Sequence, residues 1–170
     1  MKVTSTTLYK KISKYDSFAS KEVIQKAFNI SKQAHSNQYR SSGEEYFTHP
    51  LAVADFLIDM KLDSATIITA LLHDVVEDSA ITLDNIKNEF GDEISKLVDG
   101  VTKLSRLDIR FGFAQAENFR KLLLASSDDI RVLLVKLADR LHNIRTIDGI
   151  QNDEKRSRIC YETLEIYAPL

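Results

Sequence analysis

Residues 64–78 read SATIITALLHDVVED, and this stretch decides the fold class. At about 100° per residue, its aliphatic side chains cover one half of a helix. These side chains are Ile67, Ile68, Leu71, Leu72, Val75 and Val76. The other half carries one imidazole and three carboxylates within an arc of roughly 140°, namely His73, Asp74, Glu77 and Asp78. This face has no Lys, so its carboxylates repel one another unless a cation lies against them. The segment therefore predicts a helix with a metal-binding face.

The rest of the chain also shows helical periodicity. Apolar spacing and capping residues predict further helices over residues 23–34, 50–58, 82–91, about 94–98, 114–125, 129–144 and from 153 to the end. No segment alternates with period two for long enough to form a strand, and five Gly and two Pro are too few for the turns of a β-sandwich. We therefore predict one all-α domain over residues 1–170, in which residues 1–17 form a loosely ordered or short helical lead.

The composition narrows the class of protein. Hydrophobic residues make up 44% of the chain and charged residues 28%, which is typical of a globular domain. The net charge of −2 does not favour a nucleic-acid partner. The apolar runs are too short to cross a membrane, and the N-terminus lacks the apolar stretch of a signal peptide. The single Cys160 excludes a disulfide framework and a cysteine zinc site. We expect a cytoplasmic protein with no membrane partner.

A second polar interruption lies in the segment 129–144. Asp139 and Asn143 stand four residues apart in an otherwise strongly apolar helix. An ionised carboxylate in such a place costs several kcal/mol unless it is paired or bound to a metal. Lys136 or Arg140 could be an ordinary salt-bridge partner of Asp139, and the residues alone leave that alternative open.

His49 precedes Pro50 at the start of a predicted helix. Alone, a histidine in this position is more often a cap or a core residue than a ligand. Combined with the other two segments, however, it completes a set of four candidate metal ligands from three helices. These ligands are His49, His73, Asp74 and Asp139. Two imidazoles and two carboxylates suit a divalent transition ion such as Mn, Fe, Co or Zn.

Four sequence blocks, in this order, resemble the signatures of the RelA/SpoT hydrolase domain. They are residues 35–50 (HSNQYRSSGEEYFTHP), 70–78 (ALLHDVVED), 98–104 (VDGVTKL) and 135–146 (VKLADRLHNIRT). The resemblance extends over about residues 18–170. It implies an HD-type helical bundle around one Mn²⁺ ion. It also implies hydrolysis of the 3′-diphosphate of ppGpp or pppGpp, which yields pyrophosphate and GDP or GTP.

The same resemblance implies roles for individual residues. His49, His73, Asp74 and Asp139 would bind the metal, and Glu77 with Asp78 would position and activate the attacking water. The predicted substrate contacts are Arg40, Ser41 and Ser42 near the guanine, Asn143 and Thr146 near the base and ribose, and Lys103 at the diphosphate. For His35 and His142 we predict a structural role.

The chain departs from the family pattern in three places. Ser41 stands where members often have a basic residue, and Glu45 stands where Pro is usual. The sequence also stops where long members continue, so we expect a stand-alone small alarmone hydrolase with no synthetase domain. Two alternatives remain open at this point: an HD phosphohydrolase of another nucleotide or phosphorylated cofactor, and an inactive nucleotide-binding fragment of a longer SpoT-like protein. The sequence also leaves the oligomeric state open.

Overall fold

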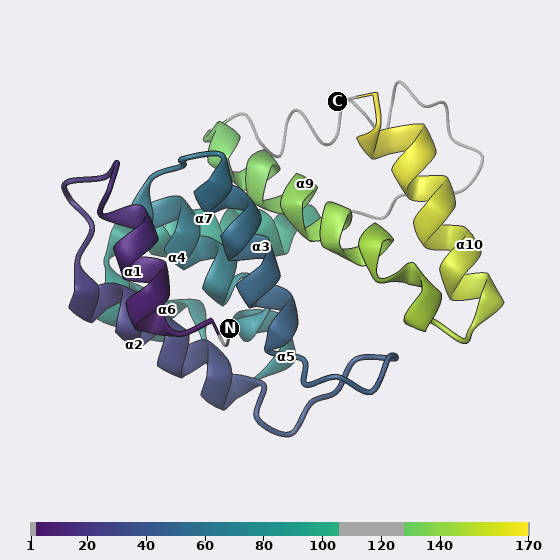
Figure 1. The fold of residues 1–170 in the computed structure, drawn as a ribbon, viewed down its shortest axis with the longest axis horizontal. Helices are drawn as coiled ribbons and strands as arrows, with labels where there is room; N and C mark the ends of the chain where they lie inside the picture. The colour runs from purple at the N-terminus through teal and green to yellow at the C-terminus, as the bar shows by residue number, and fades with distance from the viewer. Residues whose placement is uncertain (1–2, 106–127, 170) are drawn as a thin grey trace.

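The computed structural model describes residues 3–105 and 128–169, which form a helical bundle (Figure 1). The helices are α1 (Ser5–Ile12), α2 (Lys21–Ala34), α3 (Thr48–Asp59), α4 (Ser64–Leu72), α5 (Val75–Asp78), α6 (Leu83–Phe90), α7 (Asp92–Ser105), α9 (Ile130–Arg145), η1 (Ile147–Gly149), α10 (Asp153–Glu162) and the π-helix η2 (Thr163–Tyr167). Within the described ranges there is no strand, only an isolated antiparallel bridge between Tyr39 and Glu45. The predicted all-α class is therefore confirmed, whereas the helix predicted over residues 114–125 lies outside the described residues.

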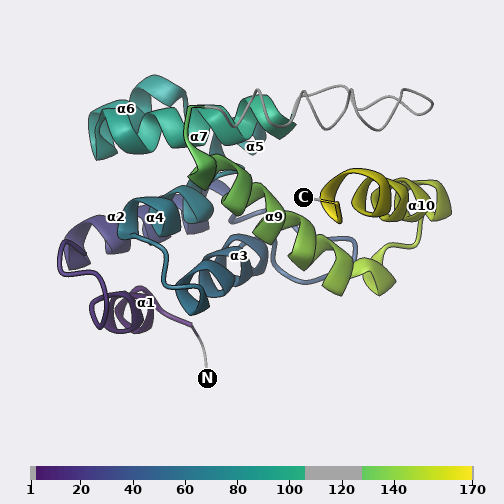
Figure 2. The same ribbon diagram turned by 90° about the horizontal axis from the view of Figure 1, so that it is seen from above.

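Helix α4 is the centre of the core. It packs against α2, α3, α7 and α9, and every residue from Thr66 to Leu72 is buried. In Figure 2, α6 and α7 lie on one side of α4, and α1 and α3 lie on the other. The apolar composition of α4 explains its position, because a helix that is hydrophobic all round is stable only in a core. Its N-cap Asp63 accepts a hydrogen bond from the Thr66 amide, as sequence capping predicts.

The helix predicted over residues 64–78 is wrong in one respect, because it is interrupted. Helix α4 ends at Leu72, and the separate short helix α5 begins at Val75. The ring of His73 donates from Nδ1 to the carbonyl oxygen of Ala70, three residues earlier, at 2.7 Å. The carbonyl of Asp74 then accepts from the amides of Glu77 and Asp78 and so starts the next turn. Periodicity could not predict this break, since both His73 and Asp74 keep right-handed helical backbone angles.

Several other helix ends are confirmed. Thr82 forms a capping box with Asn85 at the start of α6. The same helix ends at Gly91, whose φ of +87° is in the left-handed region that favours glycine. The N-terminal lead contains helix α1, which buries Leu8 and Ile12.

The C-terminal part packs on one side of α9. Helix α10 buries no residue, but Ile166 and Tyr167 of η2 are buried. Arg140 of α9 contacts both of these elements. It pairs with Glu162 of α10 at 2.8 Å, and its guanidinium lies 4.4 Å from the ring centroid of Tyr167 in η2. This part of the chain thus depends on α9 for its position.

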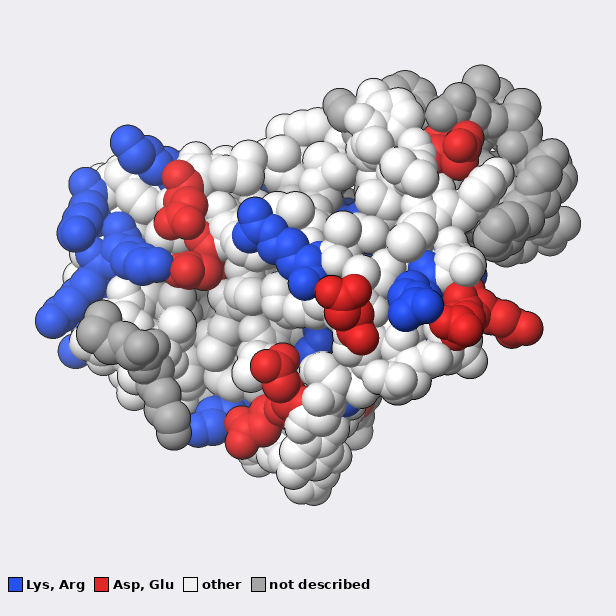
Figure 3. All heavy atoms as spheres, turned by 45° about the vertical axis from the view of Figure 1, so that its right-hand side comes forward, with Lys and Arg blue, Asp and Glu red and all other residues white. Residues whose placement is uncertain are grey.

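None of the described helices is long and apolar enough to cross a membrane. On the face shown in Figure 3, basic side chains gather at one end, and acidic and basic side chains are interspersed over the rest.

Candidate functional site

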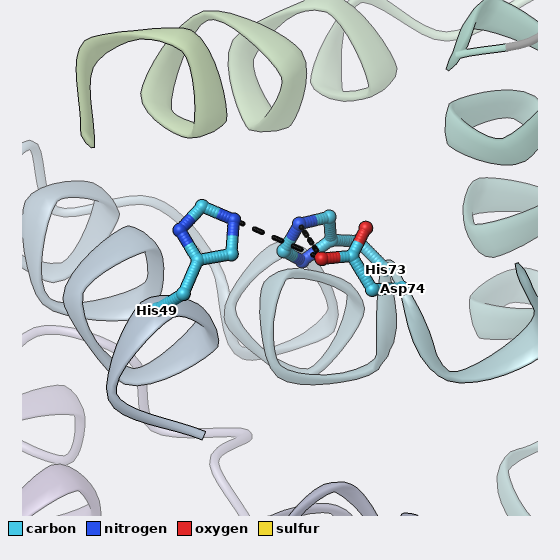
Figure 4. Close-up of side chains that lie close together, drawn as sticks. All are labelled: His49, His73 and Asp74. Atoms are coloured by element: carbon cyan, nitrogen blue, oxygen red, sulfur yellow. Dashed lines mark ion pairs between the residues drawn. The ribbon is translucent and has the colours of Figure 1, made fainter. Parts of the chain in front are cut away.

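Three helices bring the four predicted metal ligands together. His49 lies in the first turn of α3, His73 and Asp74 follow the end of α4, and Asp139 lies in α9. Ligand atoms of His49, His73 and Asp74 all lie within 4.8 Å of one another (Figure 4). Asp74 Oδ2 is 3.1 Å from His73 Nε2 and 3.8 Å from His49 Nε2. Asp139 Oδ1 reaches the same group from α9, at 3.1 Å from His49 Nε2.

The two imidazoles turn their Nε2 atoms toward these carboxylates. Because a carbonyl oxygen only accepts, the Nδ1 of His73 carries the hydrogen that Ala70 receives. The Nε2 atom of His73 is buried and makes no aligned hydrogen bond, although Asp74 lies within ion-pair distance. In neutral His73 this atom has a lone pair that faces a carboxylate. A buried acceptor that faces another acceptor is the arrangement that a bound cation would satisfy.

His142 orients the other imidazole. Its Nδ1 lies 2.8 Å from Nδ1 of His49, and its ring centroid is 4.8 Å from that of His49. When His49 donates from Nδ1 to His142, its Nε2 keeps a free lone pair on the side of Asp139. In that tautomer, the structural role predicted for His142 would be to orient a candidate ligand, and it stays a prediction.

Charge in the site is balanced by neighbouring side chains. Burial lowers the pKa of His73, but the adjacent Asp74 outweighs it and raises the pKa to about 9. Burial likewise opposes ionisation of Asp74, yet His73 lowers its pKa. The pKa of His49 is lowered by burial. Burial and the nearby His49 lower the pKa of His142 to about 4, so that ring is neutral at physiological pH.

One carboxylate oxygen of Asp139 is in an ordinary ion pair, and the other faces the cluster. Its Oδ2 accepts from the buried Lys136 at 2.6 Å, and its Oδ1 accepts from Asn143 at 2.7 Å. Coulombic attraction to Lys136 helps to lower the pKa of Asp139, against the effect of burial. The alternative left open by the sequence is thus resolved in favour of Lys136, since Arg140 pairs with Glu162 instead. The ion pair does not replace the contact of Oδ1 with His49.

Glu77 and Asp78 lie on α5 at the exposed rim of the cluster. Burial and the neighbouring charge of Asp74 raise the pKa of Asp78. The Gln38 side chain donates to the backbone oxygen of Asp78 at 2.8 Å, and its Oε1 lies 2.7 Å from Nδ1 of His35. His35 and Gln38 therefore hold the end of the short helix that carries the acidic pair.

A pocket of about 290 Å³ lies beside the cluster. It is lined by Tyr39, Arg40, Ser41, Ser42, Tyr46, Asn143, Thr146, Gly149, Ile150, Lys155 and Ile159. Arg40 donates from Nη2 to Asn143 Oδ1 at 3.1 Å and to Thr146 Oγ1 at 3.0 Å. Asn143 in turn donates to Asp139, so one hydrogen-bond chain joins the pocket to a candidate metal ligand. The structure brings five of the six predicted substrate residues into this pocket.

Lys103, the sixth predicted substrate residue, lies elsewhere. Its side chain is 72% exposed, pairs with Asp99 at 2.6 Å, and lines a different pocket together with Arg131. Its contact with a diphosphate stays a prediction.

Sequence reasoning missed part of the pocket wall. Tyr39 and Tyr46 belong to the block at residues 35–50, whose pattern alone gave them no role. Lys155 and Ile159 come from α10, where no sequence feature pointed to the site. Gly149 allows η1 to approach the loop before α3, because a Cβ there would lie 2.8 Å from the Ser42 Cβ.

The profile of the HD domain family matches residues 27–170, which is most of the chain. The protein belongs to this family. The match includes every candidate ligand. The residues present fit a divalent ion, since two imidazoles and the Asp74 carboxylate lie together around a buried nitrogen without a hydrogen bond, and Asp139 contacts His49 from the side of α9.

Relatives in the RelA/SpoT family confirm the resemblance. The chain is 53% identical over 164 residues to the GTP pyrophosphokinase rsh of Brucella ovis, covering 96% of this chain and 22% of that protein. It is 52% identical over 148 residues to the bifunctional (p)ppGpp synthase/hydrolase SpoT of Escherichia coli K12, covering 86% and 21%. The chain thus spans about a fifth of the length of these curated relatives.

A solved structure of a metazoan SpoT orthologue, described as hydrolysing ppGpp, has the same fold. It matches with a TM-score of 0.69 and 23% identity, covering 88% of this chain and 85% of that one.

Proposed function

We propose that this HD domain hydrolyses the 3′-diphosphate of ppGpp and pppGpp in the cytoplasm, with Mn²⁺ held by His49, His73, Asp74 and Asp139. The observation that carries the proposal is the grouping of these four side chains beside a pocket of about 290 Å³ and an acidic pair. The named activity of the SpoT relatives supports the choice of substrate.

The chain's own residues account for the remaining steps. A divalent ion bound here would lower the pKa of a coordinated water and neutralise charge on the phosphoryl oxygens. We assign to Glu77 and Asp78, which follow Asp74 on α5, the acceptance of the proton of that water, and the raised pKa of Asp78 supports this role. The water oxygen bonds to the phosphorus next to the ribose, and the bond from that phosphorus to the 3′ oxygen breaks. The 3′ oxygen takes up a proton, and pyrophosphate leaves.

The pocket residues would hold the nucleoside. Arg40 offers a planar guanidinium on which a purine can stack, and its present partners Asn143 and Thr146 offer polar atoms for the base and ribose. Ser41 is uncharged, at a position where family members often have a basic residue. Guanine selectivity therefore depends chiefly on Arg40 and Asn143.

The first test is turnover of ppGpp by the purified, metal-stripped protein after addition of Mn²⁺, with pyrophosphate release as the measurement. The variant Glu77→Gln/Asp78→Asn should release pyrophosphate at least about 100-fold more slowly, which is typical of the loss of a general base. Asp84→Asn, an exposed carboxylate on α6, serves as the matched control and should keep full activity.

The outcomes separate the competing functions. Pyrophosphate release that needs metal and the acidic pair supports the hydrolase. A folded, Mn²⁺-binding protein that leaves ppGpp intact but cleaves another nucleotide would establish the alternative substrate. If it binds ppGpp and cleaves nothing, the inactive binding module is the correct description. An Arg40→Ala variant completes the series, since it should raise KM for guanine nucleotides much more than it lowers kcat.

A further inference from the structure

Tyr46 connects the pocket to the metal cluster. Its hydroxyl donates to Asp74 Oδ2 at 2.7 Å, and its side chain also lines the pocket beside Arg40. The ring lies between two histidines, with centroids 4.8 Å from His35 and 5.9 Å from His49. Its backbone amide donates to the Gln38 carbonyl at 2.9 Å, which fixes the segment before α3. The tyrosine is therefore held from both its backbone and its ring.

The oxygen that Tyr46 contacts is the one that faces the imidazoles. Oδ2 of Asp74 lies 3.1 Å from His73 Nε2 and 3.8 Å from His49 Nε2. The terminal side-chain torsion of an aspartate has broad energy minima, so its carboxylate can rotate unless another group holds it. A hydroxyl that donates to Oδ2 opposes this rotation and keeps that oxygen on the side of the two rings.

The Tyr46 hydroxyl is the donor in its contact with Asp74, because a carboxylate oxygen only accepts. The other ligands have comparable partners: Ala70 for His73, His142 for His49, and Lys136 with Asn143 for Asp139. Such partners commonly change metal affinity 10- to 100-fold when they are removed.

We propose that Tyr46 is a positioning residue, which orients the metal-facing oxygen of Asp74. Because Tyr46 also lines the pocket, this wall of the pocket supports the metal site. The inference rests on the proposed function only in so far as the four-residue cluster binds a divalent ion. It assigns to Tyr46 no contact with the reacting atoms.

The test is the affinity of the full chain for Mn²⁺, measured by titration of free Mn²⁺ in electron paramagnetic resonance with no nucleotide present. Tyr46→Phe keeps the ring and removes only the hydroxyl, and it should weaken binding about 10-fold or more. Tyr15→Phe is the matched control. It removes a hydroxyl that donates to the Leu62 carbonyl at 2.9 Å, outside the site, and should leave Mn²⁺ affinity unchanged.

A double-mutant cycle separates orientation of Asp74 from a general loss of packing. If Tyr46 acts through Asp74, the loss in Tyr46→Phe/Asp74→Asn should equal that in Asp74→Asn alone. Additive losses, or a Tyr46→Phe variant that binds Mn²⁺ as tightly as the unchanged chain, would overturn this inference and leave the proposed hydrolase intact. Absence of Mn²⁺ binding by the unchanged chain would overturn both. Circular dichroism verifies that each variant is folded.

Discussion

His73 is the residue whose charge state decides how the site behaves without metal. Its ring is fully buried, so its proton on Nε2 is stabilised mainly by the ion pair with Asp74 and further by the charge of Asp139. A metal ion needs the same Nε2 lone pair. Protons and metal therefore compete for one atom, and both depend on the same carboxylate.

The pH dependence of stability follows from the direction in which the pKa of His73 is shifted. The metal-free pKa of His73 is raised to about 9 from its usual 6.5. The ion pair therefore stabilises the metal-free fold fully below about pH 6.5, and this stabilisation is lost as pH rises through 9. We expect metal-free unfolding free energy, measured in urea, to fall by on the order of a few kcal/mol between pH 6.5 and 9.5.

Mn²⁺ affinity should change in the opposite direction, rising with pH up to about 9 because His73 must release its proton on binding. The variant His73→Asn provides the control, since its stability should lack this pH dependence. If the unchanged chain and the variant show the same stability profile, the His73–Asp74 ion pair does not govern it.

At the scale of elements, the sequence predicted most of the helices because their apolar spacing and caps are local properties. It also predicted which side chains form the cluster, since His73, Asp74 and Asp139 stood in places that a solvated or core residue fits poorly, and His49 completed the set. The break after Leu72 was not predictable, because the apolar spacing continues across it and both His73 and Asp74 keep right-handed helical angles. The part of α10 in the pocket was missed for a different reason: Lys155 and Ile159 reach it only through tertiary packing.

The contact between α7 and α9 makes an element-level prediction. A Cβ at Gly100 would lie 2.7 Å from Cγ2 of Val132, a β-branched side chain with little rotational freedom. Gly100→Ala would therefore push α9, which carries Asp139, away from α7. We expect a net loss of about 1–2 kcal/mol in the free energy of unfolding, because overpacking outweighs the higher helix propensity of Ala.

Denaturant unfolding of three variants tests this contact. Gly100→Ala should be less stable than the unchanged chain, and Gly100→Ala/Val132→Ala should be more stable than the sum of the two single changes predicts. Strict additivity would show that the two side chains do not collide. Mn²⁺ affinity of Gly100→Ala, measured alongside, reports whether the shift of α9 reaches Asp139.

For the molecule as a whole, the site lies where two parts of unequal packing meet. The proposed metal ligands stand on α3, directly after α4 and on α9, in or next to the buried centre. One wall of the pocket instead comes from η1 and α10, and α10 has no buried residue. The metal cluster should consequently be rigid before substrate arrives, whereas the outer wall of the pocket is supported mainly through Arg140.

Hydrogen exchange should reveal this difference. Backbone amides of α10 should exchange much faster than those of α4, because few contacts oppose local opening of a helix without buried side chains. Binding of ppGpp to the inactive Glu77→Gln/Asp78→Asn variant should then slow exchange in α10, since a nucleotide in the pocket would lie against Lys155 and Ile159. Helix α1, which does not line the pocket, should be unaffected. If α10 is as protected as α4 without nucleotide, or if ppGpp binds and leaves its exchange unchanged, α10 is a fixed wall and takes no part in substrate binding.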